Sequence, residues 1–136
     1  MAKLNRITLC AVCLFMLMAC GEKLSPEEVA LAEAKKTVQT SYEQLLAGNY
    51  DSFLEGRSGN SSLPESYREQ LRASCKQFVA QQEKLHHGIR SFSVSNARID
   101  SAQQLIQVFL ILNYGDSTNE EIVVPVIKQD GVWKMK

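Results

Sequence analysis

The apolar residues of this chain change their spacing at Gly88, and this change limits the fold more than any other feature of the sequence. Before Gly88 they recur every three or four residues, which is the period of one helix face. After it, apolar and polar residues alternate, which is the pattern of strands with one buried face. Helices followed by strands that can pair as a meander predict an α+β domain.

Signals at the helix ends divide the first part into three helices. The start Ser25-Pro26-Glu27-Glu28, whose serine and last glutamate can form a capping box, opens a helix that ends near Gly48. A short second helix is expected over 50–54, a Gly/Ser-rich loop over 56–62, and a third helix after Pro64. The apolar stripes are Leu31, Ala34, Val38, Tyr42 and Leu45 in the first helix, and Tyr67, Leu71, Cys75, Phe78, Gln82 and Leu85 in the third.

Four antiparallel strands are expected after Gly88. In the first, Phe92 and Val94 alternate with serines, and a shift of the apolar parity near Asn96 predicts a β-bulge. Asp130-Gly131 predicts the turn of a terminal hairpin. The expected fold is therefore three helices packed on a four-stranded antiparallel sheet. The other three strands are expected at 105–114, 121–127 and 132–136.

The first nineteen residues have the layout of a secretory signal. Lys3 and Arg6 precede an apolar run that is shorter than the ~20 residues a membrane-spanning helix needs. The segment Leu17-Met18-Ala19-Cys20 resembles the lipobox of bacterial lipoproteins, which implies removal of residues 1–19 and lipidation of Cys20. Two or more acyl chains anchor a protein stably. The alternative is an ordinary cleaved signal in which Cys20 is incidental.

On the lipobox interpretation, residues 20–24 are the lipidated cysteine and a short tether, and residues 25–136 form one domain close to the membrane. The expected location is the cell envelope, at the outer membrane where the cell has one. Cys10 and Cys13 leave with the signal, so Cys75 is the free thiol of the mature chain.

The charge of the mature chain excludes one class of partner. Removing Lys3 and Arg6 from the 15 basic residues leaves 13, against 15 acidic residues. With this slightly acidic balance and no basic patch, there is no electrostatic case for binding nucleic acid.

Two segments resemble a known family: LLAGNYDSFL, from Leu45 to Leu54, and VIKQDGVWKMK, from Val126 to Lys136. They resemble a domain family of unknown function found in bacterial lipoproteins. That family belongs to the cystatin-like cone superfamily of ketosteroid isomerase, polyketide cyclases and the nuclear transport factor, and has lumazine-binding-like relatives. The resemblance covers residues 25–136. It implies a curved sheet wrapped on a long helix around a cone-shaped cavity, and it implies no activity.

An isomerase-like site would need a carboxylate base facing that cavity and an acid that holds the oxyanion. The strand segments 105–114 and 122–127 contain no acidic residue, so such a base would come from the helices. His86-His87 cannot easily chelate one metal ion, because adjacent helical side chains point about 100° apart. No catalytic residue, metal or cofactor is therefore assigned. The helix carboxylates, which fall beside the apolar stripes, are Glu43, Asp51, Glu55 and Glu69.

Three residues are candidates for lining the cavity. Tyr42 is on the stripe of the first helix, where the simpler interpretation is a core residue with its hydroxyl tied to a neighbour. Gln82 is the one amide on the apolar stripe of the third helix, so it meets a buried polar group or reaches the cavity. Trp133 follows the hairpin turn, either as a core residue or at the cavity mouth. Cys75 is expected to be inert core rather than a nucleophile.

The middle strands are apolar on both faces. Leu105, Phe109 and Ile111 form a second apolar face, whereas an antiparallel sheet with one wet face alternates cleanly. The helices can cover only one face, so the second is expected to contact a second copy of the chain or another envelope protein. The alternative is a curled sheet whose second face is shielded by a helix end or the 56–62 loop.

The function expected from these features is a non-catalytic binding or accessory domain at the cell envelope, which holds a small apolar ligand or a partner protein. The alternative is an isomerase- or cyclase-like enzyme that acts on a small hydrophobic substrate in the cavity. A cavity-facing carboxylate beside a tyrosine would favour the enzyme.

Overall fold

A computed structural model describes residues 21, 23–60 and 62–136. The expected signal, 1–19, and the expected lipidation site, Cys20, lie outside the described residues. Helices precede strands, and the predicted α+β fold class is confirmed. The helices are α1 (Pro26–Leu46), α2 (Tyr50–Glu55) and α3 (Glu65–His86), and the strands are β1 (Ile89–Asp100), β2 (Leu105–Tyr114), β3 (Asn119–Gln129) and β4 (Val132–Met135). Within the described ranges, no helix combines the length and apolar character needed to cross a membrane.

The start of α1 is set by the capping box expected from the sequence. The backbone N–H of Glu28 donates to the Ser25 hydroxyl at 3.2 Å, and the backbone N–H of Ser25 donates to the Glu28 carboxylate at 2.8 Å. These bonds satisfy two of the amide groups that a helix start leaves without partners. The side chains that α1 buries recur every three or four residues and are Ala34, Val38, Ser41 and Leu45.

The four strands form an antiparallel meander in the order β1-β2-β3-β4. The expected bulge in β1 is present as a register shift between Val94 and Asn96. Strand β3 begins at Asn119 rather than at position 121, because Glu120 pairs with Leu112 and continues the ladder toward the turn. Strand β3 therefore begins earlier, at its N-terminal end, than the sequence pattern indicated.

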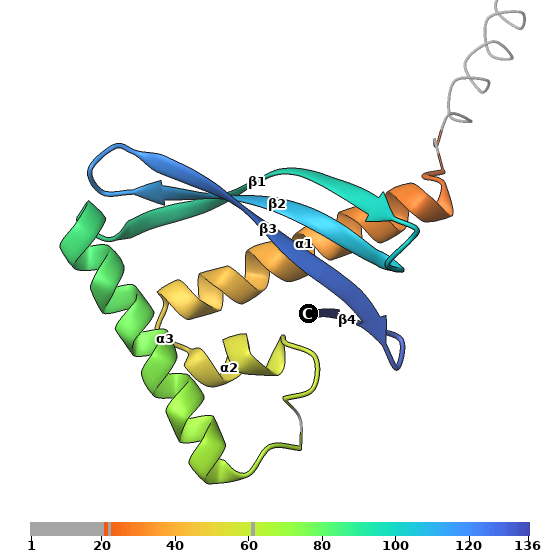
Figure 1. Cartoon of the computed structure of the whole chain (residues 1–136). Coiled ribbons are helices and arrows are strands. Elements are labelled where there is room, and N and C mark those ends of the chain that lie inside the picture. The colour runs from red at the N-terminus through yellow and green to blue at the C-terminus, as the bar shows by residue number, and fades with distance from the viewer. Residues whose placement is uncertain (1–20, 22, 61) are drawn as a thin grey trace, which may run out of the picture.

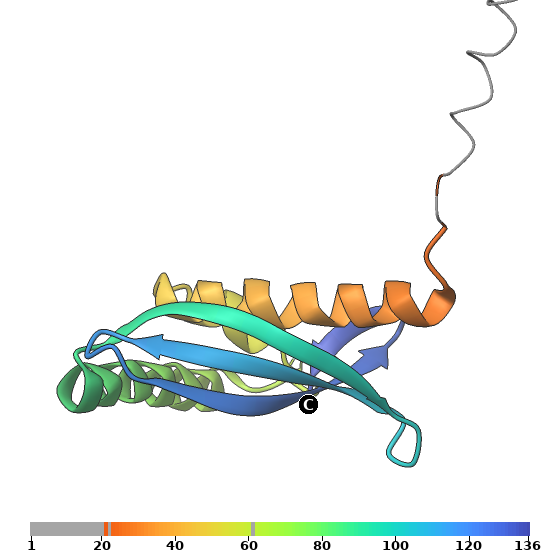
Figure 2. The ribbon, with the colours of Figure 1, turned by 90° about the horizontal axis from the view of Figure 1, so that it is seen from above.

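The core lies between α1 and the sheet. Figure 1 shows α1 lying lengthwise along the sheet, and Figure 2 shows from above how the strands curve beside it. Val38 of α1 is fully buried there, together with Leu110 of β2 and Val126 of β3. The buried apolar side chains of the described residues are spread along the sequence from Ala34 to Met135, and they pack into one cluster. The domain therefore has a core of its own.

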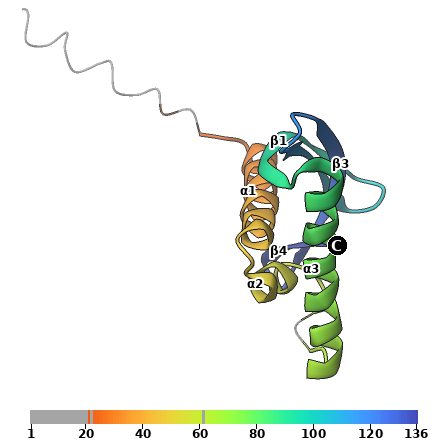
Figure 3. The same cartoon turned by 90° about the vertical axis from the view of Figure 1, so that its left-hand side faces the viewer.

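Helix α3 extends beyond the sheet. In Figures 1 and 3 it runs from the start of β1 past α2 and away from the strands. Cys75 is its one buried residue. Its C-terminal end is held to the β2–β3 turn, where the backbone N–H of Gly115 donates to the Gly88 carbonyl at 2.8 Å. A Cβ atom at position 115 would clash with the His87 carbonyl oxygen, so this close approach requires glycine.

Candidate functional site

A cavity of about 670 Å³ lies between α3 and the rest of the fold. Its walls come from the three helices, the loop after α2, and the ends of β2 and β3 that flank their turn. Cavities of this size are typical of sites for small organic molecules. The lining residues, most of them apolar or aromatic, are Tyr42, Leu45, Phe53, Leu54, Arg57, Asn60, Tyr67, Leu71, Ser74, Cys75, Phe78, Gln82, Leu112, Tyr114, Glu120 and Ile122.

Tyr42 brings a polar group to the α1 side of this cavity. Its ring packs edge-on against Phe53 and Phe92, with both pairs of ring centroids 5.3 Å apart. Burial raises the pKa of Tyr42, and the positive charge of Arg57 partly opposes that rise. Its hydroxyl forms no hydrogen bond with any described residue. This differs from the simpler interpretation of the sequence, in which Tyr42 is a core residue whose hydroxyl is bonded to a neighbour. The hydroxyl therefore stays protonated at neutral pH and can serve a ligand as donor or acceptor.

Helix α3 presents its apolar stripe to the cavity. Gln82 lies on this wall with Leu71 and Phe78, and its amide adds polarity to an otherwise hydrocarbon surface. Cys75 is 8 % exposed, and burial raises the pKa of its thiol. Because the thiolate is the reactive form, this environment disfavours a nucleophilic role.

Glu120 is the acidic residue of the cavity wall, and sequence reasoning missed it. The hydroxyl of Tyr114 donates to its carboxylate at 2.8 Å. Burial, and then this hydrogen bond, raise the pKa of Tyr114 to about 12. Glu120 lies one residue before the strand that the sequence predicted at 121–127. Ile122 and Val124 alternate on the inner face of β3, and residues two apart in a strand share a face. Extending this pattern back by two residues from Ile122 could have placed Glu120 on the inner face.

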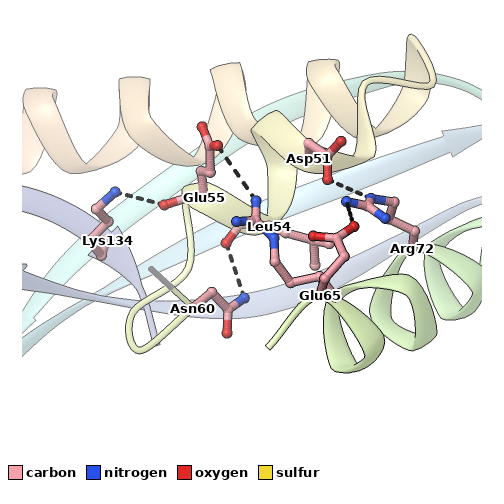
Figure 4. Close-up of polar contacts among 8 residues, drawn as sticks. Asp51, Leu54, Glu55, Asn60, Glu65, Arg72 and Lys134 are labelled. Carbon is pink, nitrogen blue, oxygen red and sulfur yellow. Dashed lines mark hydrogen bonds and ion pairs between the residues drawn. The ribbon is translucent and has the colours of Figure 1, made fainter. Parts of the chain in front are cut away.

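The prediction that a cavity carboxylate must come from the helices is wrong. Asp51 is engaged by Arg72 of α3 at 2.6 Å, Arg72 also binds Glu65 at 2.8 Å, and Glu55 lies 3.7 Å from a guanidinium of α3 (Figure 4). Glu43 accepts a hydrogen bond from a neighbouring amide on α1. These helix carboxylates, with the exposed Glu69, lie outside the cavity wall because charged groups beside an apolar stripe remain solvated.

Arg57 is the basic residue of the cavity wall, and it too was missed, because it falls in a segment read only as a loop. Its backbone forms a parallel bridge with Met135 of β4, and the N–H of Met135 donates to the Gly56 carbonyl at 2.8 Å. The Arg57 Nη2 atom donates to the backbone oxygen of Lys136 over 3.4 Å. Within the described part of the chain, no carboxylate lies within ion-pair distance of Arg57.

Trp133, the third residue expected to line the cavity, lies elsewhere. Its Nε1 donates to the Glu33 carboxylate of α1 at 2.8 Å, and the Lys128 ammonium lies 5.4 Å from its ring centroid. It borders two smaller depressions between α1 and the strands. The short strand β4 pairs with β3 at the end remote from α3, which separates Trp133 from the cavity.

The outer face of the sheet carries two of the three residues expected at an interface. Phe109 and Ile111 are half-buried on β2, and the guanidinium of Arg98 lies 5.7 Å from the Phe109 ring centroid. Neighbouring Val123 of β3 is 50 % exposed. Leu105 is 5 % exposed and is unsuited to a contact surface, because both it and the next residue are buried where β2 leaves its turn.

The end of α3 forms a polar contact with the β2–β3 turn. His86 Nδ1 lies 3.1 Å from a carboxylate oxygen of Asp116, and the His86 ring stacks on Tyr114 with centroids 4.1 Å apart. Hydrogen bonds from Thr118, and then the contact with His86, lower the pKa of Asp116 to about 2. Over the described ranges there is no group of three or more His, Cys, Asp or Glu side chains arranged to hold a metal ion.

No family model and no curated protein matches this chain. Among solved structures, a Campylobacter jejuni protein provisionally described as an NTF2-like transpeptidase is similar in fold, with a TM-score of 0.56 and 12% identity over 82% of this chain and 97% of that one. At this identity the similarity concerns the fold alone. The chain therefore has a nuclear-transport-factor-like (NTF2-like) α+β fold, with helices followed by a four-stranded antiparallel sheet.

Proposed function

We propose that the chain is a cell-envelope lipoprotein whose NTF2-like domain binds a small, largely apolar molecule without catalysis. The cavity of about 670 Å³ carries this proposal. Apolar walls with a few convergent polar groups are the usual form of a small-molecule site. Tyr42, Gln82 and Arg57 supply those groups from three different elements.

Helix α3 is the wall whose attachment governs how easily a ligand enters this cavity. Helix α3 contributes one wall and packs Leu71, Cys75 and Phe78 against the core. Its other attachments are two exposed ion pairs to α2, Arg68 with Glu55 and Arg72 with Asp51, and the hydrogen bond of its C-terminal end to the β2–β3 turn. Exposed ion pairs contribute only about 0–1 kcal/mol each. These ion pairs therefore oppose a displacement of α3 only weakly, and the apolar contacts of Leu71, Cys75 and Phe78 with the core are its main restraint.

Mass spectrometry of small molecules that co-purify with residues 21–136 tests this function. The wild-type domain is expected to retain an apolar compound. Ser74→Phe, which fills the cavity from α3, is expected to lose it, and Ser66→Phe, on an exposed part of the same helix, is the matched control. Retention by Ser74→Phe at the wild-type level would overturn the assignment of the ligand to this cavity.

A second candidate, an isomerase- or cyclase-like enzyme, is favoured by one observation: the carboxylate of Glu120 lies beside the Tyr114 hydroxyl on the cavity wall. A carboxylate base and a nearby hydroxyl donor are the groups that proton abstraction beside a carbonyl needs. Conversion of a β,γ-unsaturated ketone to its conjugated isomer, followed by ultraviolet absorbance, tests this role. Turnover that Glu120→Gln abolishes would establish the enzyme, and turnover equal in both proteins would exclude Glu120 as the base.

A further inference from the structure

Arg57 carries a positive charge on the cavity wall, and Glu120, the carboxylate of that wall among the described residues, forms no ion pair with it. Arg57 is half-buried, and its side chain has one long contact, 3.4 Å to the backbone oxygen of Lys136, among the residues the structure describes. Arg72, by comparison, is engaged by Asp51 at 2.6 Å and by Glu65 at 2.8 Å. A guanidinium has five N–H donors. Most donors of Arg57 therefore have no acceptor among the residues that the structure describes.

The charge of Arg57 acts on both helical walls of the cavity. It opposes the rise in pKa that burial produces in Tyr42 of α1 and in Cys75 of α3. These two helices lie on different sides of the fold in Figure 3. The charge of the guanidinium is therefore felt by Tyr42 on one wall and by Cys75 on the other, as expected for a cation that lies between the two helices.

The position of Arg57 is fixed by the backbone around it. The bridge to Met135 is flanked by two hydrogen bonds, from Ser58 N–H to the Met135 carbonyl at 2.7 Å and from Met135 N–H to the Gly56 carbonyl at 2.8 Å. A Cβ atom at Gly56 would lie 2.8 Å from the Ser41 hydroxyl, so this segment packs closely on α1. A binding group that starts from a held backbone loses less entropy when it engages a ligand.

From this arrangement we propose that the cavity ligand is an amphipathic anion, whose compact anionic head binds Arg57 and whose hydrocarbon body lies against Phe53, Leu71 and Phe78. The inference rests on the proposed binding function. The remaining N–H donors of this half-buried guanidinium are available to an anionic head group. The planar guanidinium fork fits a carboxylate or phosphate through two parallel hydrogen bonds. The apolar walls add the hydrophobic contribution of the body.

A set of ligands with one common chain tests the head group. Dodecanoate, dodecyl phosphate, 1-dodecanol and dodecyltrimethylammonium are titrated into residues 21–136 below their micelle concentrations, and binding is measured by calorimetry. Cooperative thermal unfolding of the domain is verified first, without detergent. Both anions are expected to bind, and more tightly than the alcohol or the cation. The order of the two anions distinguishes a fatty acid from a phosphate-headed lipid as the source.

Variants at Arg57 separate its charge from its shape. Arg57→Gln is expected to weaken dodecanoate binding about 10- to 100-fold, the range for a charge-assisted hydrogen bond, and to leave dodecanol binding within about twofold. Arg57→Lys keeps the charge but not the fork, so an intermediate loss is expected. Arg98→Gln, on the outer face of the sheet, is the matched control.

The outcomes distinguish the two proposals. Equal binding of dodecanoate and dodecanol by the wild type, unchanged in Arg57→Gln, would leave the apolar cavity standing and overturn the anionic head group. Equal loss of both ligands in Arg57→Gln would show a packing role and would also overturn it. A wild-type domain that binds none of the four compounds would overturn both the head-group inference and the proposed function.

Discussion

The hydroxyl of Tyr114 donates a 2.8 Å hydrogen bond to the carboxylate of Glu120, joining the last residue of β2 to the second residue of β3. Both side chains line the cavity, and His86 stacks on the Tyr114 ring from the end of α3. This contact therefore connects the sheet, the cavity wall and the helix that borders them.

Tyr114 is predicted to titrate at about pH 12, and Glu120→Gln is predicted to lower that value. Burial and the acceptor carboxylate both favour the protonated phenol. Because the pKa is raised in the folded state, the associated stability is present below the ordinary value of 10.0 and is lost as the pH rises from there to about 12. Ultraviolet titration of tyrosinate, with Tyr114→Phe to identify the signal, measures this. An unchanged pKa in Glu120→Gln would contradict it.

Asp116 is predicted to stabilise the fold down to strongly acidic pH. Its pKa is lowered to about 2, first by the hydrogen bonds from Thr118, so its contribution is present above the ordinary value of 3.8 and is lost as the pH falls through about 2. Thermal melting from pH 5 to pH 2 is expected to show a smaller acid dependence in Asp116→Asn than in the wild type. Asp130→Asn, in the β3–β4 turn, is the control, and equal acid dependence in all three proteins would refute the assignment.

Cys75→Ser is predicted to lower the free energy of unfolding by about 1–3 kcal/mol, because it buries a hydroxyl where the thiol packs against apolar neighbours. Denaturant titration measures the change, and Cys75→Ala separates the polar effect from the loss of volume. Rapid modification of Cys75 by a bulky thiol reagent in the native domain would argue against its burial.

Cys20→Ala is predicted to abolish lipidation and to leave an uncleaved or misprocessed precursor. The reason is the resemblance of the segment from Leu17 to Cys20 to a lipobox. Labelling with a fatty-acid probe, together with membrane fractionation, measures the effect, and Cys75→Ala is the control for a cysteine outside the lipobox. If Cys20→Ala labels and fractionates as the wild type does, the anchor proposal fails.

The outer face of the sheet is predicted to mediate self-association through Phe109 and Ile111. Their half-buried side chains and that of the half-exposed Val123 form an apolar surface. An exposed apolar surface of this kind is typical of a protein contact. Sedimentation equilibrium of residues 21–136 is expected to show a dimer that Phe109→Glu weakens, whereas Leu85→Glu, at an exposed apolar residue of α3, leaves it unchanged. A wild-type domain that is monomeric at high micromolar concentration and unchanged by Phe109→Glu would rule out this contact.

Local patterns in the sequence were sufficient for most of the fold. The capping box at Ser25, the bulge near Asn96 and the change of period at Gly88 each depend on hydrogen bonds and burial within a few residues, and each is present in the structure. The start of β3 was the exception. Polar residues near a turn carry no apolar alternation, so Glu120 could not be recognised as part of the ladder from periodicity alone.

The sequence by itself determined which faces of α1 and α3 are apolar, and hence that Tyr42 and Gln82 could face an interior space. Only the tertiary structure decided that α3 diverges from the sheet and leaves a cavity, that Arg57 is held beside that cavity by Met135, and that Trp133 is held elsewhere by Glu33. Periodicity reports how one element divides its surface between solvent and protein. The distance between two elements depends on the packing of every side chain between them, and no local pattern contains that information.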